Sequence, residues 1–380
     1  MDATSQRAER IRTDLVSLVL GPVHKALPDP MRLSLVLDGE IVSSSSVETG
    51  FLHRGLEKAL EGQSWLSCIS FVDHVDPEAA IFSELAFCIA VEKIMQLEVT
   101  PRANRIRLIL SELGRISSHL TYMVKVAKAV SADTMVHYVL RDRERVLDLF
   151  ELLTGARFSL NFLRFGGVRS DVTEGFIERV AEVCELIQFR IKEYNDLFTF
   201  NYALVQRSKN VAILDAQTVK KMGVSGPNAR AAGVDRDLRK ILPYCGYEEF
   251  DFQTPLGRGD QSTLGSVHDR LLVRLREISQ SVEILRQALE GIPAGNFSSL
   301  GPDAKPSVPK GEAYALVESA RGELGCFVVS SGGPKPWRVQ FRAPSRLHLQ
   351  VLPLLLQGNR IEDVPYIVAS LDLGLAEADR

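Results

Sequence analysis

The sequence predicts a mainly α-helical fold of the α+β class, in which a small β-hairpin precedes a bundle of long helices and a small sheet follows it. Leucines alternate with other residues up to Asp38-Gly39, a dipeptide typical of a two-residue hairpin turn. Apolar residues then recur every three or four positions over roughly two hundred residues, which is the period of a helix. Beyond Lys310, short β-branched runs separated by glycine and proline indicate strands.

The predicted hairpin leads into the ten residues 49–58, TGFLHRGLEK. Gly50 and Gly55 bracket a corner that only glycine makes at low cost, and His53 and Arg54 lie on it. Adjacent side chains on such a corner point in different directions, so both cannot be buried without partners. We predict that one of them contacts a ligand or another subunit; a plain surface pair is the alternative.

Helix starts and ends carry their own signals. Proline at the first helical position, a small polar residue before it and glycine after the last turn are typical of helix boundaries. The predicted starts and ends are Asp76-Pro77-Glu78, Thr100-Pro101, Gly155, and Asp171 with Glu174 as a capping box.

Three segments are expected to pack as one large domain. They are an N-terminal segment with the hairpin (1–53), a helical bundle (54–291), and a loop with an α/β segment packed on the bundle (292–380). Residues 201–262 are rich in glycine and are predicted to be irregular. Strands of the last segment are expected at 313–317, 325–329 and 337–341.

The composition excludes several classes of protein. The chain has 380 residues, 45% of them hydrophobic, which is enough for a large core. Its 45 basic and 48 acidic residues leave a net charge of -3, so no long-range field attracts nucleic acid. The longest apolar runs are far shorter than the roughly 20 residues needed to cross a bilayer. The polar N-terminus does not read as a signal peptide, and we expect a cytoplasmic chain.

The five cysteines are well separated and have apolar neighbours, so we expect reduced core thiols. No C-x-x-C pair or clustered Cys/His spacing occurs, and no metal site is predicted. The usual nucleotide-binding, hydrolase and metalloprotease motifs are also missing. Any chemistry of a nucleotide cofactor must therefore belong to another chain.

Several further residues are candidates for chemistry or for structure. His24 lies in a proline-rigidified loop, a setting that often lines sites, although an exposed loop histidine is as good an interpretation. His74 precedes a predicted helix start, where the helix dipole favours anions. His119, within the longest helical stripe, is interpreted as a buried histidine with a partner. Arg321 and Glu323, beside glycines before a strand, form either an ion-paired clamp or a cavity wall.

Five blocks, in order along the chain, resemble the family of the large peripheral-arm subunit of NADH:quinone oxidoreductase (complex I). They are TGFLHRGLEK, PRANRIRLILSELGRISSHL, RDRERVLDLFELLTG, RFGGVRSD and KGEAYALVESARGELG, and the match runs from about Gly21 to Arg380. The resemblance implies a helical body related to the large subunit of nickel-iron hydrogenases. It also implies a wall of a quinone cavity, next to a small subunit that carries the terminal iron-sulfur cluster.

The chain departs from this family at the quinone contacts. The loop GPVHKALPDP keeps the first family histidine, but Pro28 stands at the second. Pro77 replaces a quinone-contacting tyrosine, and Ala129 replaces the aspartate that supports the histidine. Neither proline nor alanine can donate a hydrogen bond from its side chain. Near the cluster, the family's arginine and histidine are replaced by His74 and Ser159.

If a quinone head binds, the expected polar contacts are His24, His53 and His74, with Arg54 and Arg164 as charge support. Arg164 matches a family arginine in RFGGV. The imidazoles would serve proton coupling, because they titrate near neutral pH.

The nickel ligands of the related hydrogenases are absent. The hydrogenases have two pairs of cysteines that bind nickel. This chain has Asp76 and Ala79 at the positions of the first pair, and Gly374 and Glu377 at the positions of the C-terminal pair. Thiolates hold that centre, and these residues do not replace them. Hydrogen activation is not expected.

The resemblance implies a peripheral-arm subunit without a transmembrane segment, on the cytoplasmic side of the inner membrane. Its expected partners are the small iron-sulfur subunit, the other peripheral-arm subunits and the membrane arm. The chain itself would bind no cofactor; quinone is the acceptor, and the cluster and the NADH site belong to partners. Two alternatives stay open: a redox-silent structural paralogue, and a subunit of a nickel-free membrane-bound hydrogenase-like complex.

Overall fold

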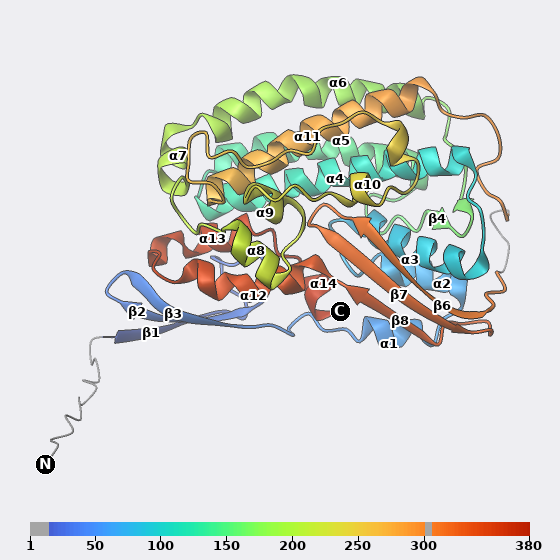
Figure 1. Cartoon of the computed structure of the whole chain (residues 1–380). Coiled ribbons are helices and arrows are strands. Elements are labelled where there is room, and N and C mark those ends of the chain that lie inside the picture. Colours follow the sequence, from blue (N-terminus) through green and yellow to red (C-terminus); the bar gives the residue numbers. More distant parts are fainter. Residues whose placement is uncertain (1–14, 301–305) are drawn as a thin grey trace, which may run out of the picture.

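In the part of the chain that the structure describes, four long helices lie together in an upper layer, with two three-stranded sheets beneath them (Figure 1). The computed structural model describes residues 15–300 and 306–380. The helices of the upper layer are α4 (Pro101–Ala129), α5 (Asp133–Thr154), α6 (Phe176–Tyr194) and α11 (Val267–Glu290). Helices α5 and α11 each pack against both α4 and α6. The predicted bundle is confirmed.

Helix α4 begins where the sequence predicts. The Thr100 hydroxyl oxygen accepts a hydrogen bond from the backbone N–H of Ala103 at 3.2 Å, and Pro101 takes the first turn, where its missing N–H has no cost. Other elements surround α4 on most faces, so it buries charged side chains, among them Glu112 and Arg115. A buried charge needs a partner, and α4 is therefore the axis of the ion-pair networks described below.

The predicted hairpin is confirmed as β2 (Arg32–Asp38) and β3 (Ile41–Glu48), with Gly39 in the left-handed region at φ 63°. The alternating leucines of β2 are buried. A further strand, β1 (Leu15–Leu20), pairs antiparallel with β2. Strand β1 was not predicted, because its side chains are exposed or half-buried and its apolar residues do not alternate.

The second sheet has the order β6 (Lys310–Glu318), β7 (Glu323–Ser331) and β8 (Arg338–Arg342), all antiparallel. The three predicted strands are confirmed. Helix α3 (Ala80–Met95) packs against β6 and β7. Residues 301–305, which belong to the predicted surface loop before this sheet, lie outside the described residues.

Short elements connect the layers. Helices α1 (Leu56–Leu60) and α2 (Trp65–Val72) follow the first sheet, and β4 (Leu163–Arg164) pairs with β5 (Gly167–Val168). The region predicted to be irregular contains α7 (Tyr202–Ser208), α8 (Ala216–Met222), α9 (Gly226–Ala231) and α10 (Leu238–Ile241). The chain then ends with α12 (Pro344–Leu356), α13 (Val364–Ser370) and α14 (Leu375–Asp379). Single turns of other helix types are η1 (Asn195–Thr199), η2 (Tyr247–Glu249) and η3 (Ile361–Asp363).

Two predicted helix starts are wrong. Helix α6 begins only at Phe176, after Gly175 at φ 75°, and Asp171 does not cap it. The Asp171 carboxylate instead accepts a hydrogen bond from Nε of Arg102 at 2.8 Å. Helix α3 begins at Ala80, and Asp76 forms an ion pair with a distant arginine. In both places the carboxylate accepts a local hydrogen bond, from the backbone N–H of Glu78 or of Val172, and also pairs with a distant arginine, while the helix begins several residues later.

One hydrophobic cluster includes side chains from the first sheet, the helices and the C-terminal elements. The five cysteines lie within the described residues and are unpaired. Four of them are buried, as predicted for core thiols, and Cys245 is half-buried. Over residues 15–300 and 306–380, no helix combines the length and the apolar character that crossing a bilayer requires.

Candidate functional site

A cavity of about 370 Å³ opens between the loop joining β1 to β2, the C-terminal half of α4 and helix α13. It contains two of the three positions at which the chain departs from the family's quinone contacts, Pro28 and Ala129. The remaining lining residues are Lys25, Ala26, Leu27, Asp29, Glu78, Thr121, Val124, Lys125, Lys128, Pro365 and Ala369. The cavity is therefore a pocket of mixed character, with apolar side chains and charges of both signs in its wall.

A smaller pocket of about 30 Å³ shares Glu78 with this cavity. Its lining includes Pro77, at the position of the family's quinone-contacting tyrosine, and Ser159, at the position of the family's histidine near the cluster. Four of the five divergent positions, which lie far apart in the sequence, thus line two pockets that share Glu78, and His74 lines neither pocket.

A buried charge cluster lies behind the cavity wall. The Arg321 guanidinium, 1% exposed, donates hydrogen bonds to carboxylate oxygens of Asp76 and Glu78, and its Nε donates to the backbone carbonyl of Asp372 at 3.1 Å. Lys125 Nζ lies 2.6 Å from a Glu78 carboxylate oxygen and 3.8 Å from one of Asp372. Burial alone would raise the pKa of Asp372, but the charges of Arg321 and Lys125 outweigh it and lower that pKa. The cations thus keep Asp372 and Glu78 ionised, whereas burial raises the pKa of Asp76.

Three of the four positions that hold nickel ligands in the hydrogenases surround Arg321. Asp76 pairs with it, and a Cβ placed on Gly374 would lie 3.1 Å from the guanidinium carbon and 3.2 Å from Cγ of Glu377. Carboxylates and an arginine thus stand among positions where a metal centre requires thiolates. Among the described residues, no group of three or more His, Cys, Asp or Glu side chains is placed to hold a metal ion.

Glu377→Gln is expected to remove a pH dependence of stability. Burial and then the negative charge of Asp76 raise the pKa of Glu377 to about 7, from 4.5 for an ordinary glutamate. The folded chain holds this proton more tightly than the unfolded chain does. The stability that this group contributes is therefore complete below pH 4.5 and is lost as the pH rises toward 7, by about 3 kcal/mol. Urea unfolding of the full chain between these pH values measures the slope, and a Gln variant with the wild-type slope would contradict the assignment.

His53 and Arg54 bind the C-terminal helix. The His53 Nδ1–H donates to the backbone carbonyl of Asp379 at 2.8 Å, and Arg54 Nη2 donates to that of Ala376 at 3.0 Å. Both side chains are otherwise exposed, on the predicted glycine corner, where Gly55 has φ 61°. The corner therefore holds α14 in place. Neither His53 nor Arg54 is among the described residues that line the cavity.

The other predicted contacts are scattered. His24 is exposed, and its Nδ1 accepts a hydrogen bond from the backbone N–H of Ala26 at 3.1 Å. His74 is exposed after the end of α2. Arg164 is half-buried and donates to the backbone carbonyls of Asn161 and Leu163, at 3.0 and 2.7 Å. The structure does not bring these side chains together, and their contact with an acceptor stays a prediction.

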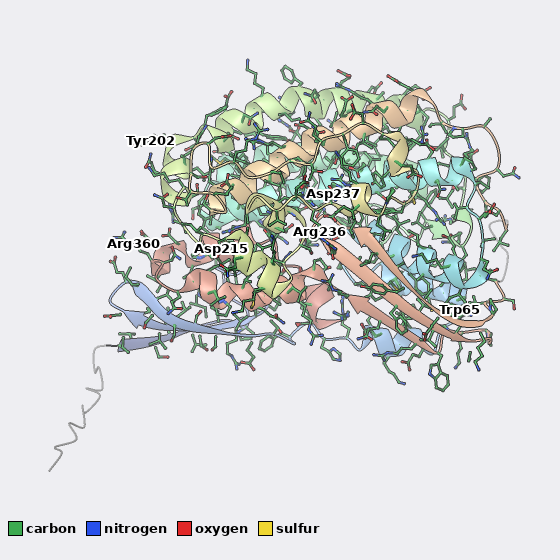
Figure 2. The ribbon with its side chains drawn as sticks, viewed as in Figure 1. Trp65, Tyr202, Asp215, Arg236, Asp237 and Arg360 are labelled. Atoms are coloured by element: carbon green, nitrogen blue, oxygen red, sulfur yellow. The ribbon has the colours of Figure 1, made fainter. Side chains whose placement is uncertain are left out.

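Arg321 and Glu323 belong to different ion pairs. Arg321 is in the cluster behind the cavity, whereas Glu323 pairs with Arg236 and, at 3.3 Å, with Arg342. Figure 2 shows Arg236 and Asp237 in the segment that enters α10, close to the sheet. Of the two interpretations of Arg321 and Glu323, the ion-paired clamp fits each residue, because each forms ion pairs with other side chains. A role as cavity wall stays a prediction.

His119 is buried, and its Nε2 donates to a Glu277 carboxylate oxygen at 2.9 Å, as predicted. The sequence analysis missed Lys125, Glu78 and Asp29 as cavity residues. The one available signal was spacing, because Lys125 lies one helical turn before Ala129 and faces the same side of α4.

The family described as "Respiratory-chain NADH dehydrogenase, 49 Kd subunit" matches residues 129–306 and 301–380. The chain belongs to this family. One relative, an NADH-quinone oxidoreductase subunit of Desulforamulus reducens, is 43% identical over 370 residues, which cover 97% of this chain and 99% of the relative. Another, NADH-quinone oxidoreductase subunit 4 of Thermus thermophilus, is 38% identical over 405 residues, which cover 100% of this chain and 98% of the relative.

A solved structure is also similar over the whole chain. It is a chain of the membrane-bound sulfane sulfur reductase (MBS), an archaeal respiratory membrane complex, with a TM-score of 0.92 and 35% sequence identity. The superposition covers 97% of this chain and 100% of that chain. The resemblance to the large peripheral-arm subunit of complex I and the fold class predicted from the sequence are confirmed.

Proposed function

We propose that this chain is the peripheral-arm subunit of a complex I-like NADH:quinone oxidoreductase that walls the cavity in which electrons pass from a terminal iron-sulfur cluster to a quinone. The observation that carries the proposal is the 370 Å³ cavity at Pro28 and Ala129. An open cavity at the family's contact positions is what a quinone head requires, whereas a chain that had lost the reaction has no need to keep it open.

The relatives named NADH-quinone oxidoreductase match this chain from end to end, and this does not favour the silent paralogue or the hydrogenase-like complex. The chain would hold no cofactor of its own. The cluster would sit on the small iron-sulfur subunit and the NADH site on other partners, with the assembly bound to a membrane arm at the cytoplasmic face of the inner membrane.

The proposal is tested by filling the cavity. Ala129→Phe places a bulky ring in its wall. Inhibitor-sensitive NADH:quinone turnover of the purified assembly is expected to fall by roughly a hundredfold, because displacing a bound reactant by about 1 Å has an effect of that order. NADH:ferricyanide activity, which does not need the quinone cavity, should remain. The control is Ala203→Phe, at an exposed alanine of α7.

Two results would contradict the proposal. One is a wild-type assembly that oxidises NADH with ferricyanide but shows no inhibitor-sensitive quinone turnover. The other is an Ala129→Phe assembly that turns over quinone as fast as the Ala203→Phe assembly.

A further inference from the structure

Each of the three lost quinone contacts has a charged side chain close by in the same cavity wall. Asp29 follows Pro28, Glu78 follows Pro77, and Lys125 precedes Ala129 by one turn of α4. The polar groups of the cavity are therefore displaced by one residue or one helical turn. The loss of the familiar side chains does not leave an apolar pocket.

Among the lysines of this wall, Lys125 is the one that is mostly buried and still has hydrogen-bond donors to spare. Its side chain is 11% exposed, and Nζ makes a hydrogen bond of 2.6 Å with Glu78. The Asp372 carboxylate, at 3.8 Å, is beyond hydrogen-bond distance. An ammonium group has three donors, so within the described chain two of them remain for the cavity.

The neighbouring cations do not compete for this role. Arg321 uses each of its three guanidinium nitrogens on Asp76, Glu78 and Asp372 and is 1% exposed. Lys25 and Lys128 also line the cavity, but both are exposed to solvent, which weakens a hydrogen bond to a ligand.

The surroundings keep Lys125 charged. Burial alone would lower the pKa of Lys125, but the negative charges of Glu78 and Asp372 outweigh it and raise that pKa. Burial also acts to raise the pKa of Glu78, yet Lys125 and Arg321 lower it. Asp29 is the other acid facing the ammonium group, and burial raises its pKa.

We propose that Lys125, positioned by Glu78, is the hydrogen-bond donor to the acceptor's head group in this cavity. The ligand class is a molecule that presents a carbonyl or anionic oxygen, as a quinone head does. Lys125 is then the contact residue and Glu78 the positioning residue. The inference rests on the proposed function and adds to it the residues that recognise the acceptor.

The test compares Lys125→Met, Lys125→Arg and the wild type in the assembled complex, with decylubiquinone as the quinone probe. Methionine keeps much of the side-chain length and removes the charge and the donors. The KM for decylubiquinone is expected to rise about tenfold or more in Lys125→Met, which is the usual weight of a charge-assisted hydrogen bond. Lys125→Arg, which keeps a charged donor, should recover most of this loss.

A matched control is Lys58→Met. Lys58 also forms a lysine–glutamate pair, with Glu61, but at the surface and outside this cavity. Its KM for decylubiquinone should equal that of the wild type. A KM in Lys125→Met within about twofold of the control, at unchanged ferricyanide activity, would overturn the inference while leaving the proposed function intact.

If the complex with Lys125→Met does not assemble, the Glu78→Gln variant tests the inference instead. Glutamine keeps the shape of Glu78 but holds the ammonium group less firmly, so a KM that rises severalfold, with kcat less affected, supports the inference. A Glu78→Gln assembly with the wild-type KM overturns it. Absence of quinone turnover in the wild type is a different result, which removes the proposed function itself.

Discussion

Arg321→Met is expected to destabilise the protein by about 3 to 5 kcal/mol, the range for breaking a buried ion pair by removing one partner. The guanidinium is fully buried and pairs with Asp76 and Glu78, and its Nε lies 3.8 Å from a carboxylate oxygen of Asp372. Methionine fills much of the volume but leaves buried carboxylates without their main counterion. Thermal melting of the full chain, and the yield of assembled complex, measure the effect.

Arg360→Met is the matched control for this substitution. Arg360 also pairs with a glutamate, Glu362, but both side chains are exposed, and Figure 2 shows Arg360 at the surface of the molecule. Solvent and salt screen such a pair, so no measurable change in the melting temperature is expected. If Arg321→Met melts together with Arg360→Met, the charge cluster is not what holds this region in place.

Glu112→Gln is the second substitution with a large expected effect, again about 3 to 5 kcal/mol. Glu112 is fully buried in α4 and lies 3.3 Å from nitrogens of both Arg115 and Arg239. The hydroxyls of Tyr247 and Ser281 donate to it at 2.5 and 2.6 Å. An amide has one acceptor oxygen and no charge, so the buried Arg115 loses its carboxylate partner, and Arg239 keeps only Asp237.

The same variant should also change how the free energy of unfolding depends on pH in the acidic range. Burial acts to raise the pKa of Glu112, but Arg115 and Arg239 outweigh it and lower that pKa. The stability from this carboxylate is therefore present above its ordinary pKa of 4.5 and is lost as the pH falls toward the lower folded value. Urea unfolding measures the free energy of unfolding at neutral and at acidic pH. The difference between these two values should be smaller for Glu112→Gln than for the wild type. Glu248→Gln, an exposed neighbour in η2, is the control and should behave as the wild type does.

Local chemistry made part of the fold predictable. The hairpin and the cap at Thr100 are decided by a few adjacent residues, and the structure has both, although the two-residue loop is Gly39-Glu40 and Asp38 still pairs with Ile41. The stripe on α4 likewise predicted the helix that carries the buried charges. Strand β1 escaped prediction because its partners are on another strand and its own pattern is not alternating.

The candidate site was harder to predict, because its contacts are long-range. Glu78 and Lys125 are 47 residues apart, and Arg321 is 243 residues from Glu78. Periodicity cannot report such pairs. The resemblance located the cavity through Pro28 and Ala129, while the residues that face the acceptor in our proposal had no family counterpart to point to them. Conversely, the His53 and Arg54 corner is conspicuous in the sequence, and its contacts serve to hold α14.

The place of Arg321 among the positions of the hydrogenase ligands couples two residues of this chain. A cysteine at position 374 would bring its Cβ to 3.1 Å from the guanidinium carbon, so the arginine, which carboxylates hold in place, would have to shift. Removing the arginine alone leaves those carboxylates unpaired. Each change is therefore unfavourable by itself, and the residue tolerated at position 374 depends on the residue at position 321.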